Sequence, residues 1–127
     1  MGFVDTNVFI EEVCRKGAKS DKCHELLCNK TLWTTGLVLS EVEWVMRSIY
    51  EKEKELICNY LGVILESTNI KIPGKRVYKE ALELFRSMNV DWVDCVNYLK
   101  AKKKGIKVAI TYDKHFNKFD GIVRKEP

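Results

Sequence analysis

Two aspartates follow short apolar segments that are typical of β-strands. Asp5 comes directly after Gly-Phe-Val (2–4), and Asp113 follows the β-branched run 106–111 and one tyrosine. Aspartate is uncommon inside strands, so each of these residues marks a strand end. In a parallel sheet the carboxyl ends of the strands form the edge at which ligands bind. We therefore expect Asp5 and Asp113 to face the same cleft.

A third acid lies inside a helix predicted over residues 37–50. At about 100° per residue, Glu41 falls in the centre of an apolar stripe that includes Leu37 and Trp44. A carboxylate in such a stripe is costly unless it is paired or binds a cation. Glu43 falls on the opposite face, four residues before Arg47, where a surface ion pair explains it. The pattern favours a metal-binding or catalytic role for Glu41, with a buried structural ion pair as the alternative.

Two further acids, Asp91 and Asp94, lie three residues apart where a helix over 91–104 is predicted to begin. They share one face of that helix, away from its apolar side. On this helix alone, capping by Asp91 with Asp94 as a first-turn acid is the simpler explanation. Together with the other acids, Asp94 completes a set of four, to which Asp91 is auxiliary.

Four carboxylates in one cleft cannot all stay ionised without a counter-charge. A hard divalent cation supplies that charge, and oxygen ligands alone favour Mg²⁺ or Mn²⁺. Such a cation lowers the pKa of a bound water and stabilises charge on phosphate oxygens. The predicted chemistry of Asp5, Glu41, Asp94 and Asp113 is therefore hydrolysis of a phosphodiester.

Positive charge is concentrated near the end of the sequence. The chain carries a formal net charge of +4, but residues 100–127 alone hold nine Lys and Arg against three acids. A basic segment attached to a mildly acidic body suits a nucleic acid, whose backbone it would hold through phosphate contacts. A solvated, lysine-rich helix end is the alternative reading of the same charges.

The elements that position these residues alternate along the chain. Helices are predicted after Asn7 and over 20–29 (with Ser20 as N-cap), 37–50, 51–65, 75–88 and 91–104, and strands over 2–4, 31–35, 69–72, 106–111 and 122–123. Short strands alternating with helices predict parallel βαβ units. The first strand and the run 106–111 are expected to be buried. The length of 127 residues and the composition, 46% hydrophobic and 31% charged, predict one globular domain over residues 1–127.

Several classes of site and location are unsupported. The chain has neither G-x-G-x-x-G nor G-x-x-x-x-G-K-[ST], which argues against dinucleotide and P-loop sites. Its five cysteines include no C-x-x-C pair, so we expect free thiols rather than a zinc site. No apolar run approaches the roughly 20 residues of a membrane span, and the first residues do not resemble a signal peptide. We therefore expect a cytoplasmic location without membrane contact.

Four segments, in order, resemble the motifs of PIN-domain ribonucleases, most closely the toxins of VapBC-type toxin–antitoxin pairs. They are FVDTNVFI (3–10), LVLSEVEWVM (37–46), VDWVDCVNYLKAKKKG (90–105) and AITYDKHF (109–116), which place Asp5, Glu41, Asp94 and Asp113 at the acidic positions. The resemblance covers nearly the whole chain. It implies an α/β fold, a three-layer α/β/α sandwich with a mainly parallel central sheet.

The resemblance also implies Mg²⁺- or Mn²⁺-dependent cleavage of RNA. Asp5 and Asp94 would be direct metal ligands, Glu41 and Asp113 would complete the cluster, and Asn7 and Thr111 would orient carboxylates or substrate. Family members commonly form homodimers and are inhibited by an antitoxin protein. Their targets are structured RNAs of the transfer or ribosomal class.

Three other readings stay open. One is a PIN nuclease of RNA processing or quality control that has no antitoxin. A second is a PIN-like module that binds RNA without cutting it. The third is a phosphoacceptor receiver domain, but this chain has a lone Asp5 after its first strand and no aspartate after the middle strand in IKIPG.

Overall fold

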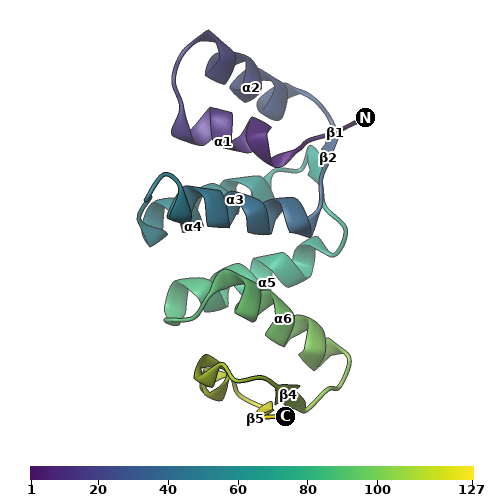
Figure 1. The fold of residues 1–127 in the computed structure, drawn as a ribbon. Coiled ribbons are helices and arrows are strands. Elements are labelled where there is room, and N and C mark those ends of the chain that lie inside the picture. Colours follow the sequence, from purple (N-terminus) through teal and green to yellow (C-terminus); the bar gives the residue numbers. More distant parts are fainter.

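The computed structural model describes residues 1–127 as an α/β fold, which confirms the predicted class (Figure 1). The helices are α1 (Thr6–Cys14), α2 (Ala18–Asn29), α3 (Gly36–Ser48), α4 (Lys54–Glu66), α5 (Lys75–Ser87) and α6 (Trp92–Lys103), with a short 3₁₀ helix, η1 (Lys114–Lys118). The strands are β1 (Gly2–Phe3), β2 (Leu32–Trp33), β3 (Ile70–Lys71), β4 (Val108–Ile110) and β5 (Val123–Lys125). Every predicted helix and strand is present, within a few residues of its expected bounds. No helix has the length and apolar character needed to span a membrane.

All strand pairs are parallel, as predicted, but they form two sheets, so the strands that precede Asp5 and Asp113 do not share one sheet as we expected. One sheet has the order β1-β2-β3, and the other joins β4 to β5. Figure 1 shows the helices in successive pairs, from α1 and α2 through α3 and α4 to α5 and α6, with β4 and β5 beyond α6. The first sheet therefore lies near the N-terminal helices and the second at the C-terminal end.

The core runs continuously through the helix pairs. It includes Phe9 of α1, Leu39 of α3, Leu61 of α4 and Trp92 of α6, which are fully buried. The Trp92 ring packs edge-to-face against Phe85 of α5, with ring centroids 5.8 Å apart. Aromatic contacts of this kind add to the burial of apolar surface, so this contact holds α5 and α6 to each other.

Local sequence explains where the helices begin and end. The side chain of Asp5 accepts a hydrogen bond from the Thr6 amide and caps α1, and Thr35 caps α3 through the Val38 amide. Gly105 follows α6 with φ of +74°, a conformation that glycine adopts without strain. Ser20 is not the N-cap that we predicted, because α2 begins at Ala18. Its hydroxyl instead donates to the Arg15 carbonyl and joins α2 to the end of α1.

The prediction that the first strand and the run 106–111 are buried is wrong for β1 and β4, although Val4, which follows β1, is buried with 2% exposure. Phe3 is 58% exposed and Ile110 is 72% exposed. The physical reason is strand order, since β1 and β4 are both edge strands with a neighbour on one side only. Few other elements pack against an edge strand of a small sheet, so its apolar side chains stay exposed.

The buried face of α3 also differs from the prediction. Its core face carries Leu39, Val42 and Met46, and Glu43 lies among them with 2% exposure. Glu41 is exposed, because the stripe to which it belongs includes Leu37 and Trp44, which are 79% and 51% exposed. The ion pair between Glu43 and Arg47 is confirmed, with Nε to Oε2 at 2.7 Å, but its carboxylate is in the core.

Candidate active site

Thr6 joins the first pair of predicted acids. Asp5 follows β1, and its Oδ1 accepts a hydrogen bond from the Thr6 amide at 2.7 Å. The Thr6 hydroxyl, which is nearly buried, donates to Oε2 of Glu41 at 3.2 Å. Thr6 therefore contacts both carboxylates. Its amide binds Asp5 at the start of α1, and its hydroxyl binds Glu41 of α3.

Asp94 and Asp113 form the second pair, on α6 and after β4. Burial, the negative charges of Asp113 and Asp91, and a hydrogen bond with Asp113 raise the pKa of Asp94 to about 6. His115 lowers the pKa of Asp94, but by less than the other effects raise it. Burial is the largest of these effects, so the raised pKa marks a partly desolvated carboxyl that lies near two other acids.

Thr111 and His115 fix the loop that carries Asp113. The Asp113 amide donates to the Thr111 hydroxyl at 3.0 Å, and Oδ1 of Asp113 accepts a hydrogen bond from the His115 amide at 2.9 Å. The His115 ring lies on the same oxygen, with Nδ1 at 3.4 Å. The Thr111 hydroxyl thus helps to hold the loop that carries Asp113 in place.

A contact between α3 and α6 relates the two acid pairs to one another. The indole nitrogen of Trp92 donates to the hydroxyl of Ser40 at 3.1 Å. Ser40 precedes Glu41, and Trp92 lies between Asp91 and Asp94 in the sequence. Because Trp92 is fully buried, this hydrogen bond sets the register of the two helices that carry Glu41 and Asp94.

The structure gathers the four acids as two pairs and not as one cluster. No group of three or more carboxylate, imidazole or thiol side chains is arranged to hold a metal ion together. Mg²⁺, however, is often bound by one or two carboxylates, with waters and substrate phosphates as its other ligands. The donor chemistry of the Asp94 and Asp113 pair, and its raised Asp94 pKa, fit such a cation.

The remaining predicted residues lie at the margins of these pairs. Asn7 is exposed, two residues after Asp5, and lines a cavity beside α1. Asp91 is also exposed, and although it occupies the N-cap position of α6, its side chain makes no capping hydrogen bond. The capping explanation is therefore confirmed in position but not in hydrogen bonding, and the charge of Asp91 also raises the pKa of Asp94.

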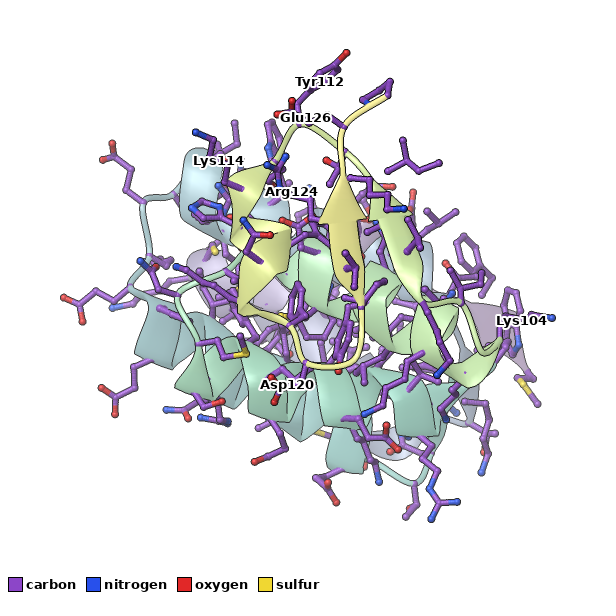
Figure 2. All side chains as sticks on the ribbon, turned by 90° about the horizontal axis from the view of Figure 1, so that it is seen from below. Lys104, Tyr112, Lys114, Asp120, Arg124 and Glu126 are labelled. Atoms are coloured by element: carbon purple, nitrogen blue, oxygen red, sulfur yellow. The ribbon has the colours of Figure 1, made fainter.

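Cations adjoin the second acid pair. A cavity of about 190 Å³ beside Asp91 and His115 is lined by Arg47, Lys52 and Lys54. At the C-terminal end, Lys114 and Arg124 lie near the β4–β5 sheet, which Figure 2 shows from below. Arg124 donates to the carbonyl of Thr111 at 3.1 Å, so this cation supports the strand that leads to Asp113. Basic side chains therefore lie near the segments that carry Asp91 and Asp113.

Sequence reasoning missed one buried acid, Glu11 of α1, which is 8% exposed. Its spacing of four residues from Arg15 was a visible signal of an ion pair, and the two side chains lie 3.6 Å apart. The burial of Glu11 could not be predicted from the sequence, because it depends on how α2 packs against α1.

Comparison with known proteins gives concordant results. The PIN domain family model matches residues 2–122. The VapC ribonuclease of Aquifex aeolicus is 27% identical over 110 residues, which are 87% of this chain and 73% of that protein. The crystal structure of Mycobacterium tuberculosis VapC20, a sarcin-ricin loop cleaving toxin, aligns with a TM-score of 0.46 and 21% identity over 100% of both chains. Since the family model spans nearly the whole sequence, this chain belongs to the PIN domain family.

Proposed function

We propose that this chain is a divalent-metal-dependent endoribonuclease and the toxin of a type II toxin–antitoxin pair. The observation that carries the proposal is the pair of Asp94 and Asp113, two neighbouring carboxyl groups with a partly buried Asp94. A cavity lined by Asp91 and His115 together with three cations supports it. The similarity to the VapC ribonuclease of Aquifex aeolicus supports RNA as the substrate. The resemblance of four motifs to VapBC-type toxins supports the toxin role.

In this proposal Asp5 and Asp94 hold Mg²⁺ or Mn²⁺, and Glu41 and Asp113 complete the acidic cluster. When bound, the cation lowers the pKa of a water and neutralises charge on the phosphate oxygens. Because the four acids are divided between two pairs, we propose that both pairs act on one scissile phosphate, whose oxygens would be further ligands of the cation.

The side chains around the acids position them and the RNA. The Thr6 hydroxyl orients Glu41, and Thr111 holds the loop of Asp113. Asn7 and Asp91, both exposed at the margins, would contact substrate. Arg47, Lys52 and Lys54 would bind flanking phosphates, contacts that are insensitive to sequence and weaken with salt.

The proposed partners follow from the same similarity. A structured RNA of the transfer or ribosomal class is the expected substrate, in the cytoplasm, and an antitoxin protein is the expected inhibitor. We also propose a homodimer, which light scattering of the purified protein would test. A small gene for the antitoxin beside the gene for this chain would favour the toxin, and its absence would favour an RNA-processing nuclease.

Cleavage of a pool of structured RNAs tests the proposal. The wild type should cut RNA with Mn²⁺ and stop cutting with EDTA, and Asp5→Asn and Asp94→Asn should abolish cutting. Asp120→Asn is the matched control, because Asp120 is exposed and lies outside both pairs. Tight RNA binding without any cutting would instead indicate a non-catalytic RNA-binding module. Equal cutting by the wild type and both variants in EDTA would contradict the proposed site.

A further inference from the structure

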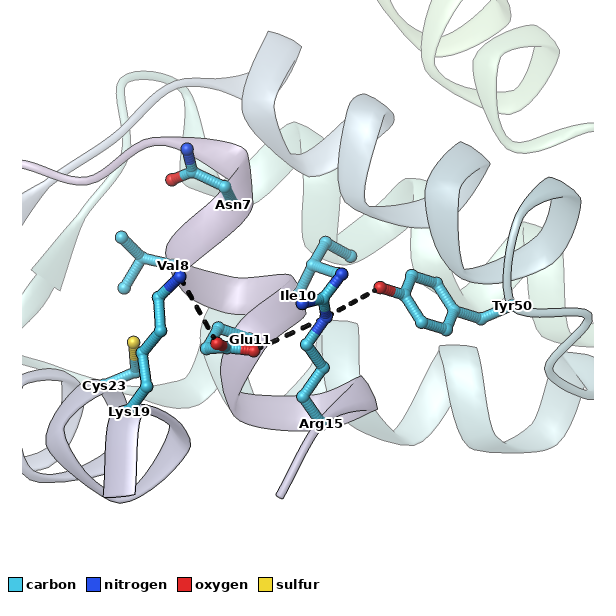
Figure 3. Close-up of a pocket in the computed structure, with 8 residues that line it drawn as sticks. All are labelled: Asn7, Val8, Ile10, Glu11, Arg15, Lys19, Cys23 and Tyr50. Carbon is cyan, nitrogen blue, oxygen red and sulfur yellow. Dashed lines mark hydrogen bonds and ion pairs between the residues drawn. The ribbon is translucent and has the colours of Figure 1, made fainter. Parts of the chain in front are cut away.

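A cavity of about 300 Å³ lies beside α1, separate from both acid pairs. Figure 3 shows the polar side chains that line it, among them Asn7, Glu11 and Arg15 from the α1 segment, Lys19 from α2, and Tyr50 after α3. Its size is at the lower end of the range of sites that bind small ligands. The cavity combines one acid, two cations and a phenol.

Glu11 is the unusual member of this group. Its side chain is 10% exposed, and its Oε2 is buried without accepting any hydrogen bond. The nearest cations, Nε of Arg15 and Nζ of Lys19, are each 3.6 Å away, beyond hydrogen-bond distance (Figure 3). Buried carboxylates nearly always accept hydrogen bonds, so an unused acceptor pair in a cavity points to a missing donor.

The two cations are exposed to solvent, although each forms an ion pair with Glu11. The side chains of Arg15 and Lys19 are 60% and 83% exposed. Nε of Arg15 donates to the Tyr50 hydroxyl at 3.0 Å and not to Glu11. Movement of Arg15 onto a phosphate would remove the cation that lies 3.6 Å from Oε2 of Glu11. With Glu11 ionised the three charged groups sum to +1, which suits a ligand that carries one phosphate.

The cavity adjoins the proposed active site. Asn7 lines it and lies two residues after Asp5. Glu11 lies one helical turn beyond Asn7, about 6 Å along α1. An RNA strand with its scissile phosphate near Asp5 would therefore bring a neighbouring nucleotide to this cavity.

The chemistry of the lining selects one base. A carboxylate offers two acceptors side by side, and guanine offers two adjacent donors, N1–H and N2–H, on one edge. Adenine, cytosine and uracil each place an acceptor beside their donor on that edge, which would repel Glu11. Single-stranded RNA is commonly read on this edge. We propose that the cavity is a guanine-specific subsite for the RNA substrate, in which Glu11 reads the base and Arg15 and Lys19 bind a phosphate.

This inference rests on the proposed RNA substrate, and a binding measurement without cleavage separates the two. Fluorescence anisotropy in EDTA would compare 12-nucleotide oligouridines that carry one central guanosine, inosine or adenosine, with GMP as competitor. Inosine lacks the N2 amino group and therefore loses one hydrogen bond to a charged acceptor. We expect guanosine to bind about tenfold more tightly than inosine, and adenosine to bind no better than inosine.

Matched variants test whether the preference for guanosine over inosine arises from the cavity. Glu11→Gln should abolish the preference for guanosine over inosine, while Glu25→Gln, on the exposed side of α2, should retain it. Lys19→Ala, at an exposed position, should weaken all three oligonucleotides equally. A thermal melt confirms that each variant is folded, and Lys19→Ala provides a test if Glu11→Gln is not.

The outcomes are distinct. RNA binding and metal-dependent cleavage without any difference between guanosine and inosine would overturn the subsite and leave the proposed function intact. Tighter binding of GMP than of the guanosine oligonucleotide would assign the cavity to a free nucleotide and overturn the RNA assignment. Loss of the preference in Glu25→Gln as well would show that it does not arise from Glu11.

Discussion

At the scale of single residues, Asp94 is the acid whose surroundings most clearly disfavour the ionised form. Its pKa of about 6 arises first from burial and then from the like charges of Asp113 and Asp91. In the unfolded chain the carboxyl ionises near 3.8, so the ionised form opposes folding. Stability associated with Asp94 is therefore greatest at acidic pH and decreases as the pH rises through about 6.

Replacing Asp94 by asparagine should consequently stabilise the metal-free protein at pH 8. Solvent screening at this half-buried position limits the gain to roughly 1 kcal/mol, or about 3–5 °C in Tm. The difference should shrink as the pH falls from 8 to 4, because the wild-type carboxyl becomes protonated. Thermal melts in EDTA across this range would show it. A constant difference at every pH would contradict the raised Asp94 pKa.

A buried ion pair gives a second residue-scale prediction. Glu43 is 2% exposed and depends on Arg47, whose Nε and Nη2 donate to its two carboxylate oxygens. Arg47→Ala leaves this charge without its partner and should destabilise the fold by about 1–3 kcal/mol. Urea unfolding measures the loss. Lys79→Ala, which removes an exposed pair with Glu66, is the control and should change the stability by under about 0.5 kcal/mol.

At the scale of elements, the start of α3 depends on a close approach to α5. Gly36 is buried, and a Cβ at that position would overlap the phenol ring of Tyr78. Tyr78 is itself buried and packed in the core, so it cannot easily move. The close packing of these two helices thus requires glycine at position 36.

Gly36→Ala should therefore destabilise the protein by about 1–3 kcal/mol despite the better helix propensity of alanine. Gly62→Ala is the matched comparison within α4, because a Cβ there would make only ordinary contacts with Arg86 and Leu82. It should be neutral or stabilising by up to about 1 kcal/mol. Denaturant unfolding of both variants checks the pair, and equal effects of the two changes would contradict the packing around Gly36.

The positions of helices and strands in the sequence were more predictable than which of their residues are buried. Helical periodicity identified α5, and Gly105 marked the end of α6, because these signals are local in the sequence. The face of α3 was misjudged since its apolar residues extend around much of the helix, and only its packing partners decide between Glu41 and Glu43. Exposure of β4 depends likewise on strand order, which no local pattern reveals.

At the scale of the whole molecule, the acids come from four separate segments. Sequence order and motif spacing identified Asp5, Glu41, Asp94 and Asp113, but not which of them lie together. The structure pairs Asp5 with Glu41 through Thr6, and Asp94 with Asp113. Such pairing depends on how α1, α3 and α6 pack, and the same long-range packing encloses Glu11 in its cavity.

The distribution of charge over the molecule leads to a prediction about salt. Residues 100–127 concentrate nine cations near the C-terminal end, and binding RNA would release counterions from the backbone. RNA affinity should fall by about tenfold or more between 50 and 200 mM salt. Filter binding with a non-cleaved RNA would measure it, and an affinity independent of salt would argue against phosphate contacts by this surface.

The central claim is that the two acid pairs act on one phosphate as a single site. Single-turnover cleavage of one RNA by the wild type, Asp5→Asn, Asp94→Asn and the double variant tests this claim most directly. Groups that act as a unit are not additive, so each single change should lower kcat/KM by about 100-fold or more, and the double variant should lose little beyond that. Losses that multiply in the double variant, or a single variant that retains wild-type activity, would contradict a shared site.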